Sequence, residues 1–180
     1  KNGLVGWELE GRTFGVVGTG AIGLRVARIA AAFGCRVLAY SRTKKQVEGV
    51  EYVDLDMLLR ESDIVSLHVP QTPATIGMIG QRELSLMKPT AVLINTARGP
   101  VVDSKALAAA LHSGEIAGAG VDVFETEPPI AEDHPLFSAP NVVATPHVAF
   151  ATAESMVKRA GIVMENIGCY LNGTPRNVIC

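Results

Sequence analysis

The chain has few aromatic residues, no excess of charge of either sign and no long hydrophobic run. Of its 180 residues only 5% are aromatic, and 16 basic residues against 18 acidic ones leave a formal charge of -2 at pH 7. This near balance gives no general attraction to nucleic acid or to an anionic membrane, so neither is expected as a partner. No apolar stretch approaches the roughly 18 residues that a membrane-spanning helix needs. A small-molecule partner is therefore favoured.

Cysteine is also scarce. Cys35, Cys169 and Cys180 are odd in number and widely spaced, which indicates neither a disulfide framework nor a metal site. We therefore expect no bound metal and a reducing, cytoplasmic setting. The start at Lys1 shows no signal peptide and lacks Met, from which we expect a fragment of a longer protein.

Nearly half of the residues are hydrophobic, which is enough to build a buried core. Apolar strand-like runs alternate with helical patterns along the chain, as in βαβ units. The expected strands are 13–17, 36–40, 51–53, 64–69, 91–95, 117–123 and 142–144. The expected helices are 22–33, 55–61, 82–87, 103–112 with Asp103 as N-cap, and 152–171. We predict an α/β, doubly wound Rossmann fold with a mostly parallel, seven-stranded sheet, and residues 1–180 as one dinucleotide-binding domain.

Two of these helices carry apolar residues at a spacing of three to four, which places the side chains on one face. The two sets are Ile22, Val26, Ile29 and Phe33, and Met156, Ala160, Val163, Ile167 and Tyr170. We expect the first face to pack on the sheet and the second to be buried. Four prolines between residues 127 and 141 predict an irregular surface loop there.

A glycine-rich turn, Gly18-Thr19-Gly20-Ala21-Ile22-Gly23, follows the first expected strand and opens the first helix. In this context Gly18 permits a tight turn and Gly20 lets the backbone approach a pyrophosphate at the helix N-terminus. Gly23 lets the helix pack closely on the strand. The spacing alone could serve only a tight turn, but a second strand ending about 20 residues later favours a dinucleotide.

The acidic residue that usually ends that second strand is absent, and Ser41 and Arg42 stand there before Thr43, Lys44 and Lys45. A carboxylate would accept a hydrogen bond from the ribose 2′-hydroxyl and repel a 2′-phosphate, whereas Ser41 and Arg42 can donate to that phosphate. The cofactor is therefore NAD or NADP, with NADP favoured. The alternative is a solvated basic turn that accepts NAD without discrimination.

Three polar residues, Arg98, Glu127 and His147, each stand just past a strand-like run. The carboxyl ends of parallel strands line the ligand crevice of such a sheet, so we expect these residues to converge. The Arg98 guanidinium can hold a substrate carboxylate and polarise a carbonyl group. The His147 imidazole can donate or remove a proton, and Glu127 can orient this imidazole. Each residue alone would more often be structural.

The motifs together resemble the NAD-binding domain of the D-isomer-specific 2-hydroxyacid dehydrogenases over nearly the whole chain. They are the glycine turn, His68-Val69-Pro70 with Thr72-Pro73, Asn95 to Gly99 with Pro100 to Asp103, Gly120 to Pro128, and Thr145-Pro146-His147. The resemblance implies that Arg98 binds a 2-oxo acid, that His147 is the acid/base paired with Glu127, and that hydride transfer is reversible.

The same resemblance implies that Asp122 meets the nicotinamide carboxamide. Further cofactor contacts are implied at Ala21, Ile22, Val69, Pro70, Thr75, Thr96 and Ala97. It also implies a homodimer, a small 2-oxo or 2-hydroxy acid substrate, and a preceding substrate domain of about a hundred residues that this chain lacks. A corepressor-like module that binds NAD(H) without turnover is the main alternative, and a methyltransferase is a weaker one.

Overall fold

The computed structural model describes residues 6–126 and 129–178, and the chain forms two compact units. The first unit extends to Pro146 and the second begins at His147, and each is described by itself. That residues 1–180 constitute one dinucleotide-binding domain remains a prediction.

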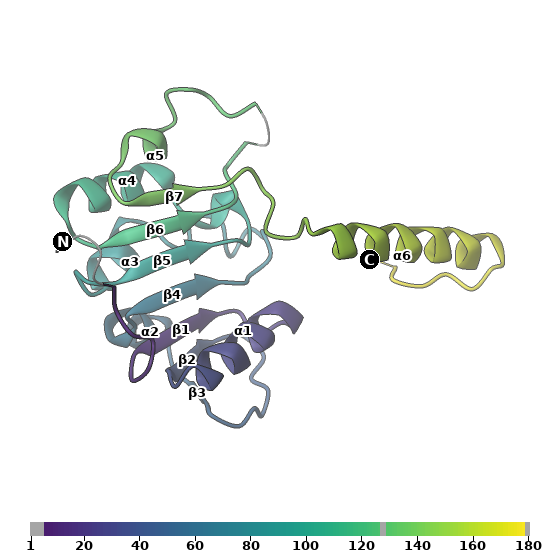
Figure 1. The fold of residues 1–180 in the computed structure, drawn as a ribbon, viewed down its shortest axis with the longest axis horizontal. Helices are drawn as coiled ribbons and strands as arrows, with labels where there is room; N and C mark the ends of the chain where they lie inside the picture. The colour runs from purple at the N-terminus through teal and green to yellow at the C-terminus, as the bar shows by residue number, and fades with distance from the viewer. Residues whose placement is uncertain (1–5, 127–128, 179–180) are drawn as a thin grey trace. The chain divides into compact units, whose positions relative to one another are not determined.

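The first unit is built on a seven-stranded sheet in which every neighbouring pair is parallel (Figure 1). Its strands are β1 (Thr13–Val17), β2 (Arg36–Tyr40), β3 (Val50–Tyr52), β4 (Ile64–Leu67), β5 (Val92–Asn95), β6 (Gly118–Val121) and β7 (Val142–Ala144). Their order is β3-β2-β1-β4-β5-β6-β7, so the direction of winding reverses between β1 and β4. This confirms the predicted Rossmann fold and puts the ligand crevice at that reversal.

Three strands have the predicted limits, β3 and β5 differ from the prediction by one residue, and β4 and β6 end two residues earlier than predicted. The runs predicted at 64–69 and 117–123 end as strands at Leu67 and Val121. Leu67 pairs with Val17 and Asn95, and Val121 pairs with Asn95 and Ala144, which are the last residues of the adjacent strands. The residues beyond are therefore released into the loops that line the crevice.

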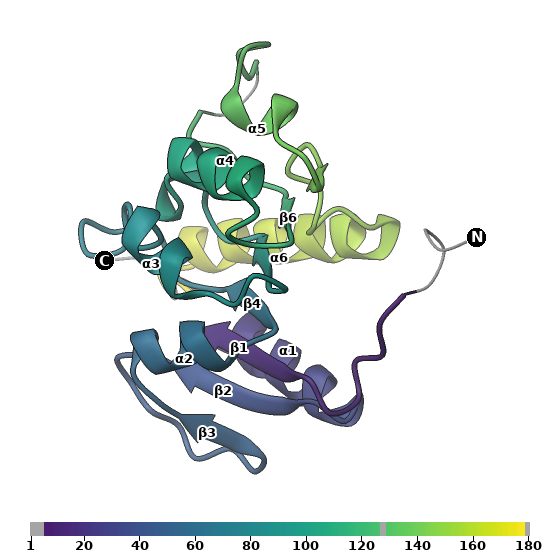
Figure 2. The ribbon, with the colours of Figure 1, turned by 90° about the vertical axis from the view of Figure 1, so that its left-hand side faces the viewer.

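Five α-helices accompany the sheet among the described residues of the first unit. They are α1 (Ala21–Ala32), α2 (Leu55–Glu61), α3 (Gln81–Leu86), α4 (Ser104–Ser113) and α5 (Pro135–Ser138). Val17 packs in the larger core cluster with Leu58 of α2, whereas the adjacent Val16 packs in a smaller cluster with Ala27 of α1. Because successive residues of a strand face opposite sides, α1 covers one face and α2, α3 and α4 follow one another along the other (Figure 2).

Local capping sets the ends of several helices. The Asp54 carboxylate accepts from the Met57 N–H at the start of α2, and Asp103 accepts from the Lys105 and Ala106 N–H groups at the start of α4. Gly114 ends α4 in the left-handed region at φ +72°. Asp103 is therefore the N-cap that the sequence predicts.

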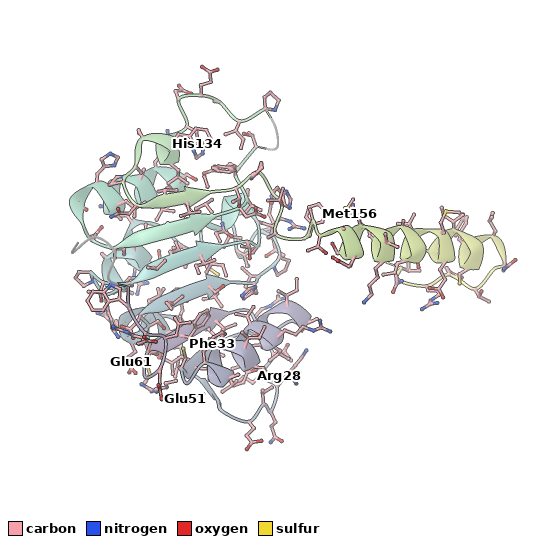
Figure 3. All side chains as sticks on the ribbon, viewed as in Figure 1. Arg28, Phe33, Glu51, Glu61, His134 and Met156 are labelled. Carbon is pink, nitrogen blue, oxygen red and sulfur yellow. The ribbon has the colours of Figure 1, made fainter. Side chains whose placement is uncertain are left out.

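The prediction for the packing face of α1 is wrong. Ile22, Ile29 and Phe33 are 69%, 57% and 58% exposed, while the small residues of the helix face the sheet. The buried residues are Gly23, Ala27 and Ala30. The glycine turn brings the start of α1 so close to the sheet that only small side chains fit between them. Phe33 and Arg28 of this helix are labelled in Figure 3.

The second unit contains one long helix, α6 (Ala153–Leu171), which begins at the N-cap Thr152. The predicted stripe on this helix, which includes Met156 (Figure 3), is not buried: no residue of α6 is. A helical spacing of apolar residues therefore does not by itself supply a packing partner. In the part of the chain that the structure describes, no helix is long and apolar enough to cross a membrane.

The proline-rich segment is less irregular than predicted. Pro135 opens the short helix α5, a position where the missing N–H of proline is tolerated. Leu136 in this helix is 2% exposed and belongs to the main core cluster. One buried leucine thus anchors a segment whose composition predicted only a loop.

Candidate functional site

The three glycines of the glycine turn have different structural reasons to be glycine. Gly18 has φ +98°, and a Cβ there would lie 2.7 Å from the His68 carbonyl oxygen. A Cβ on Gly23 would lie 1.9 Å from the Gly18 carbonyl oxygen. Gly20 has φ -70° and a Cβ there would meet nothing within 4 Å. The fold therefore requires Gly18 and Gly23, whereas Gly20 leaves open space that a ligand can use.

A cavity of about 430 Å³ opens at the carboxyl ends of β1, β2 and β4, where the winding reverses. It is lined by seven of the predicted cofactor residues: Gly18, Gly20, Ser41, Arg42, Val69, Pro70 and Thr75. Ala21, Ile22 and Gly23 form the first turn of α1, directly after this lining. The structure thus brings together residues that lie up to fifty-seven positions apart, from Gly18 to Thr75.

The charges around this cavity suit an anionic ligand. Arg42 and Lys45 line it, and no Asp or Glu stands among its described lining residues. The first turn of α1 contains no acidic residue and its N-cap Gly20 has no side chain to occupy the free N–H groups. Helix N–H groups in this condition bind phosphate oxygens well. The residues present therefore fit a dinucleotide pyrophosphate.

Hydrogen bonds also hold the 68–75 segment that lines this cavity. The Thr75 hydroxyl donates to the Pro70 carbonyl oxygen at 2.6 Å and accepts from the Thr72 N–H at 2.8 Å. His68 Nε2 lies 3.0 Å from the Ser66 hydroxyl, and burial lowers the pKa of His68. His68 is therefore neutral at neutral pH and forms part of the cavity wall.

Arg98 is presented by a turn that Asn95 holds. The Asn95 amide donates to the Arg98 carbonyl oxygen at 3.0 Å and accepts from the Ala97 N–H at 3.1 Å, although Asn95 itself is 1% exposed. Arg98 is exposed, and one of its terminal N–H groups donates to the Ala97 carbonyl oxygen at 2.6 Å. Thr96, between them, is exposed. Sequence reasoning missed Asn95, whose signal is a polar residue at the end of a buried strand.

Gly99, which follows Arg98, is buried. Gly99 begins a 3-10 turn, Gly99–Val101, rather than adopting a left-handed conformation. A Cβ there would lie 1.9 Å from both the carbonyl carbon and the oxygen of Phe124. Gly99 is therefore required by the close approach of the loop that follows β6, which brings the Arg98 turn against it.

Asp122 lies at the same edge of the sheet, just past β6, and is 3% exposed. Its backbone N–H donates to the Asn95 carbonyl oxygen at 3.0 Å. Its carboxylate accepts from the Thr145 hydroxyl at 2.5 Å. The ends of β5, β6 and β7 are thus linked through side chains and backbone. Thr145 was missed as a site residue, and its only signal is its place between the last strand and Pro146.

The other two predicted catalytic residues are not placed relative to Arg98. His147 begins the second unit and adopts φ +54°, a conformation uncommon for residues other than glycine. Within that unit its ring lies edge-on to Phe150, with centroids 5.8 Å apart. The Arg159 guanidinium lies over the Phe150 ring, 5.4 Å from the ring centroid. Glu127 lies outside the described residues.

Glu125 and His134, neither of which the sequence predicts as a site residue, form a carboxylate–imidazole pair. His134 Nε2 lies 3.1 Å from the Glu125 carboxylate, while His134 Nδ1 accepts from the Leu136 N–H at 3.4 Å and caps α5. Burial raises the pKa of Glu125, but hydrogen bonds from Ser104 and His134 outweigh it, so the pKa is lowered overall. The loop after β6 is therefore fastened by an ionised carboxylate.

A smaller cavity, of about 270 Å³, lies at the amino ends of the strands around Trp7, Ile64 and Val92. It contains none of the predicted site residues and faces away from the glycine turn. Within residues 6–126 and 129–178, no group of three or more His, Cys, Asp or Glu side chains is arranged to hold a metal ion. The predicted cofactor residues that share a cavity therefore lie at the carboxyl edge of the sheet.

Comparison with known proteins agrees with this geometry. The family described as D-isomer specific 2-hydroxyacid dehydrogenase, NAD binding domain, matches residues 1–149. The glyoxylate reductase of Thermococcus litoralis is 49% identical over 180 residues, which cover 97% of this chain and 54% of that protein. The chain thus spans about half the length of the curated relatives it matches.

Solved structures share the fold over essentially the whole chain. The D-isomer specific 2-hydroxyacid dehydrogenase from Lactobacillus delbrueckii ssp. bulgaricus, solved in its NAD complexed form, is 38% identical with a TM-score of 0.90, covering 100% of this chain and 60% of its own. An acyclic imino acid reductase in complex with NADPH and D-arginine is 39% identical with a TM-score of 0.91, covering 99% and 57%.

Proposed function

The chain belongs to the D-isomer specific 2-hydroxyacid dehydrogenase family, and on this premise we propose that its protein is an NAD(P)-dependent oxidoreductase. It interconverts a small 2-oxo acid and the corresponding 2-hydroxy acid. The observation that carries the proposal is the open space at Gly20, a glycine that the fold does not need, beside an uncapped helix N-terminus and a cation-lined cavity.

A bound nicotinamide cofactor supplies or accepts the hydride in this reaction. Arg98 holds the substrate carboxylate with its guanidinium fork and polarises the adjacent carbonyl oxygen. His147 donates a proton to that oxygen during reduction and removes it during oxidation, and Glu127 orients the imidazole. Asp122 accepts a hydrogen bond from the nicotinamide carboxamide. Asn95 keeps the Arg98 turn in place.

The remaining predicted residues bind the rest of the cofactor. Backbone groups of the glycine turn contact the pyrophosphate, and the Val69–Pro70 and Thr96–Ala97 segments and Thr75 make further contacts with the cofactor. At the adenosine end, Ser41 and Arg42 favour NADPH, because they can donate to a 2′-phosphate. The absence of a carboxylate among the described cavity residues, and a relative solved with NADPH, support this preference.

The proposal includes a homodimer in the cytoplasm. Large apolar side chains on the outer face of α1, Ile22, Ile29 and Phe33, support association with a second copy. Cys35 and Cys169 are free, which supports a reducing compartment. The curated relatives named glyoxylate reductase make glyoxylate the first substrate to test.

The test separates cofactor binding from turnover. We expect His147→Asn to lower kcat for glyoxylate reduction by about 10² to 10⁴-fold while the Kd for the cofactor changes little. The matched control is His112→Asn, at an exposed histidine of α4 whose Nδ1 bonds the Ala108 carbonyl oxygen, which should leave both quantities unchanged. Parallel losses in kcat and cofactor affinity would contradict the acid/base role. A protein that binds cofactor but reduces no 2-oxo acid would favour the corepressor-like alternative.

A further inference from the structure

The basic turn after β2 is held at two points. The Lys45 backbone N–H donates to the Tyr52 hydroxyl oxygen at 3.1 Å. The Thr19 hydroxyl donates to the Thr43 carbonyl oxygen at 3.4 Å and so ties the turn to the glycine turn. Tyr52 is the last residue of β3, where it pairs with Ala39 of β2. A segment without helix or strand is therefore fixed against the sheet.

The three cationic residues of this turn, Arg42, Lys44 and Lys45, do not all line the same cavity. Arg42 and Lys45 line the cofactor cavity, whereas Lys44 does not. Lys44 and Lys45 both line a neighbouring cavity of about 480 Å³, so Lys45 stands on the boundary between the two. Two adjacent lysines with the same charge thus differ in whether they line the cavity beside the glycine turn.

We propose that Lys45 is a specificity-determining residue for the 2′-phosphate of NADPH and that Tyr52 is the positioning residue that holds it there. This inference rests on the proposed cofactor function and adds to it the second cation and its support. A phosphate monoester carries between one and two negative charges at neutral pH, so one guanidinium leaves part of the charge uncompensated. The Lys45 ammonium supplies a second positive charge beside Arg42.

Tyr52 acts before the ligand arrives. A surface turn that must be ordered on binding loses conformational entropy at that moment, which weakens affinity. The Tyr52 hydroxyl orders the backbone at Lys45 in advance, from a half-buried position on the sheet. Removal of this hydroxyl should therefore weaken NADPH specifically, because the phosphate common to NADH and NADPH binds at the glycine turn.

The experiment measures dissociation constants for NADPH and NADH by fluorescence titration of the purified protein and its variants. We expect Lys45→Ala to weaken NADPH binding about tenfold and to leave NADH within twofold. Lys45→Arg should retain the NADPH preference, because the charge remains. Tyr52→Phe should weaken NADPH binding about threefold with NADH unchanged. The matched control, Lys44→Ala, should change neither cofactor.

A second probe isolates the phosphate. Adenosine 2′-monophosphate, used as a competitor, should lose affinity in Lys45→Ala and Tyr52→Phe, while adenosine 5′-monophosphate should not. An unchanged NADH affinity in each variant also shows that the site is still folded.

Three outcomes would overturn the inference. Equal losses for NADH and NADPH would place Lys45 at the pyrophosphate, and no loss in Lys45→Ala would make it a solvated lysine. A parent protein that binds NADH more tightly than NADPH would remove the preference to be explained. Failure of the parent to bind either cofactor is a separate result, because it would overturn the proposed function itself.

Discussion

The Thr145 hydroxyl donates a 2.5 Å hydrogen bond to the carboxylate of Asp122, which is 3% exposed. Asp122 follows β6, and Thr145 follows β7, its neighbour in the sheet. The bond therefore fixes one carboxylate oxygen of Asp122, the residue expected to meet the nicotinamide. Its donor, Thr145, stands two positions before His147.

Replacing this threonine tests the strength of the link. Thr145→Val keeps the side-chain shape but removes the donor to a charged group, so we expect the free energy of unfolding to fall by about 1 to 2 kcal/mol. Thr145→Ser, which keeps the hydroxyl, should stay closer to the parent. Urea denaturation of the three proteins measures the difference, and equal midpoints for Val and the parent would contradict it.

Gly99 should not tolerate a side chain. Gly99→Ala puts a methyl group 1.9 Å from the Phe124 carbonyl carbon and oxygen, and the obstructing atoms are backbone. We expect the free energy of unfolding to drop by about 2 to 3 kcal/mol. Gly120→Ala is the control, because its nearest atom there is Ile94 Cγ1 at 3.9 Å. Thermal unfolding should give a lower midpoint temperature for Gly99→Ala than for Gly120→Ala. Equal midpoints would show that the close approach of Gly99 to the Phe124 backbone does not limit stability.

Substitutions in the glycine turn can distinguish an effect on stability from an effect on cofactor binding. Gly20→Ala should change the free energy of unfolding by no more than about 1 kcal/mol, because its Cβ meets nothing and only the N-cap preference is lost. It should nevertheless weaken cofactor binding more than tenfold, since the pyrophosphate needs the backbone there. Gly23→Ala should destabilise the protein instead, because of the Gly18 carbonyl oxygen. Unfolding curves and cofactor titrations of both variants decide this, and undiminished binding in Gly20→Ala would count against the dinucleotide site.

His68 should make stability depend on pH. Burial lowers the pKa of His68 in the folded protein, whereas the unfolded chain titrates near about 6.5. As the pH falls below that value the unfolded state takes up a proton before the folded state does, so stability falls, by at most about 1.4 kcal/mol per pH unit.

Urea midpoints at pH 7.5 and 5.5 measure this effect. The difference between the two midpoints should shrink in His68→Gln, which cannot titrate in this range. His112→Gln, at an exposed position of α4, controls for the loss of a histidine as such. If the parent and His68→Gln respond equally to pH, another group is responsible.

Much of this protein follows from local sequence signals. The strands 13–17, 36–40 and 142–144 and the helix 55–61 are found with the predicted limits, and Asp103 caps α4 as expected. Apolar runs, capping side chains and turn glycines act over a few residues, so their effect is visible in the sequence. The alternation of strands and helices then leaves few topologies, and the Rossmann order follows.

The tertiary structure alone decided which surfaces meet. The small face of α1 is buried in place of its large apolar face, because Gly23 must approach the Gly18 carbonyl oxygen. The contacts of Gly99 with Phe124, of Thr145 with Asp122 and of Tyr52 with Lys45 are equally invisible in any local pattern. Each depends on the distance between segments that the chain brings together only when the sheet forms. Sequence by itself determined the elements and the residue types at their ends, and packing decided which of those residues touch.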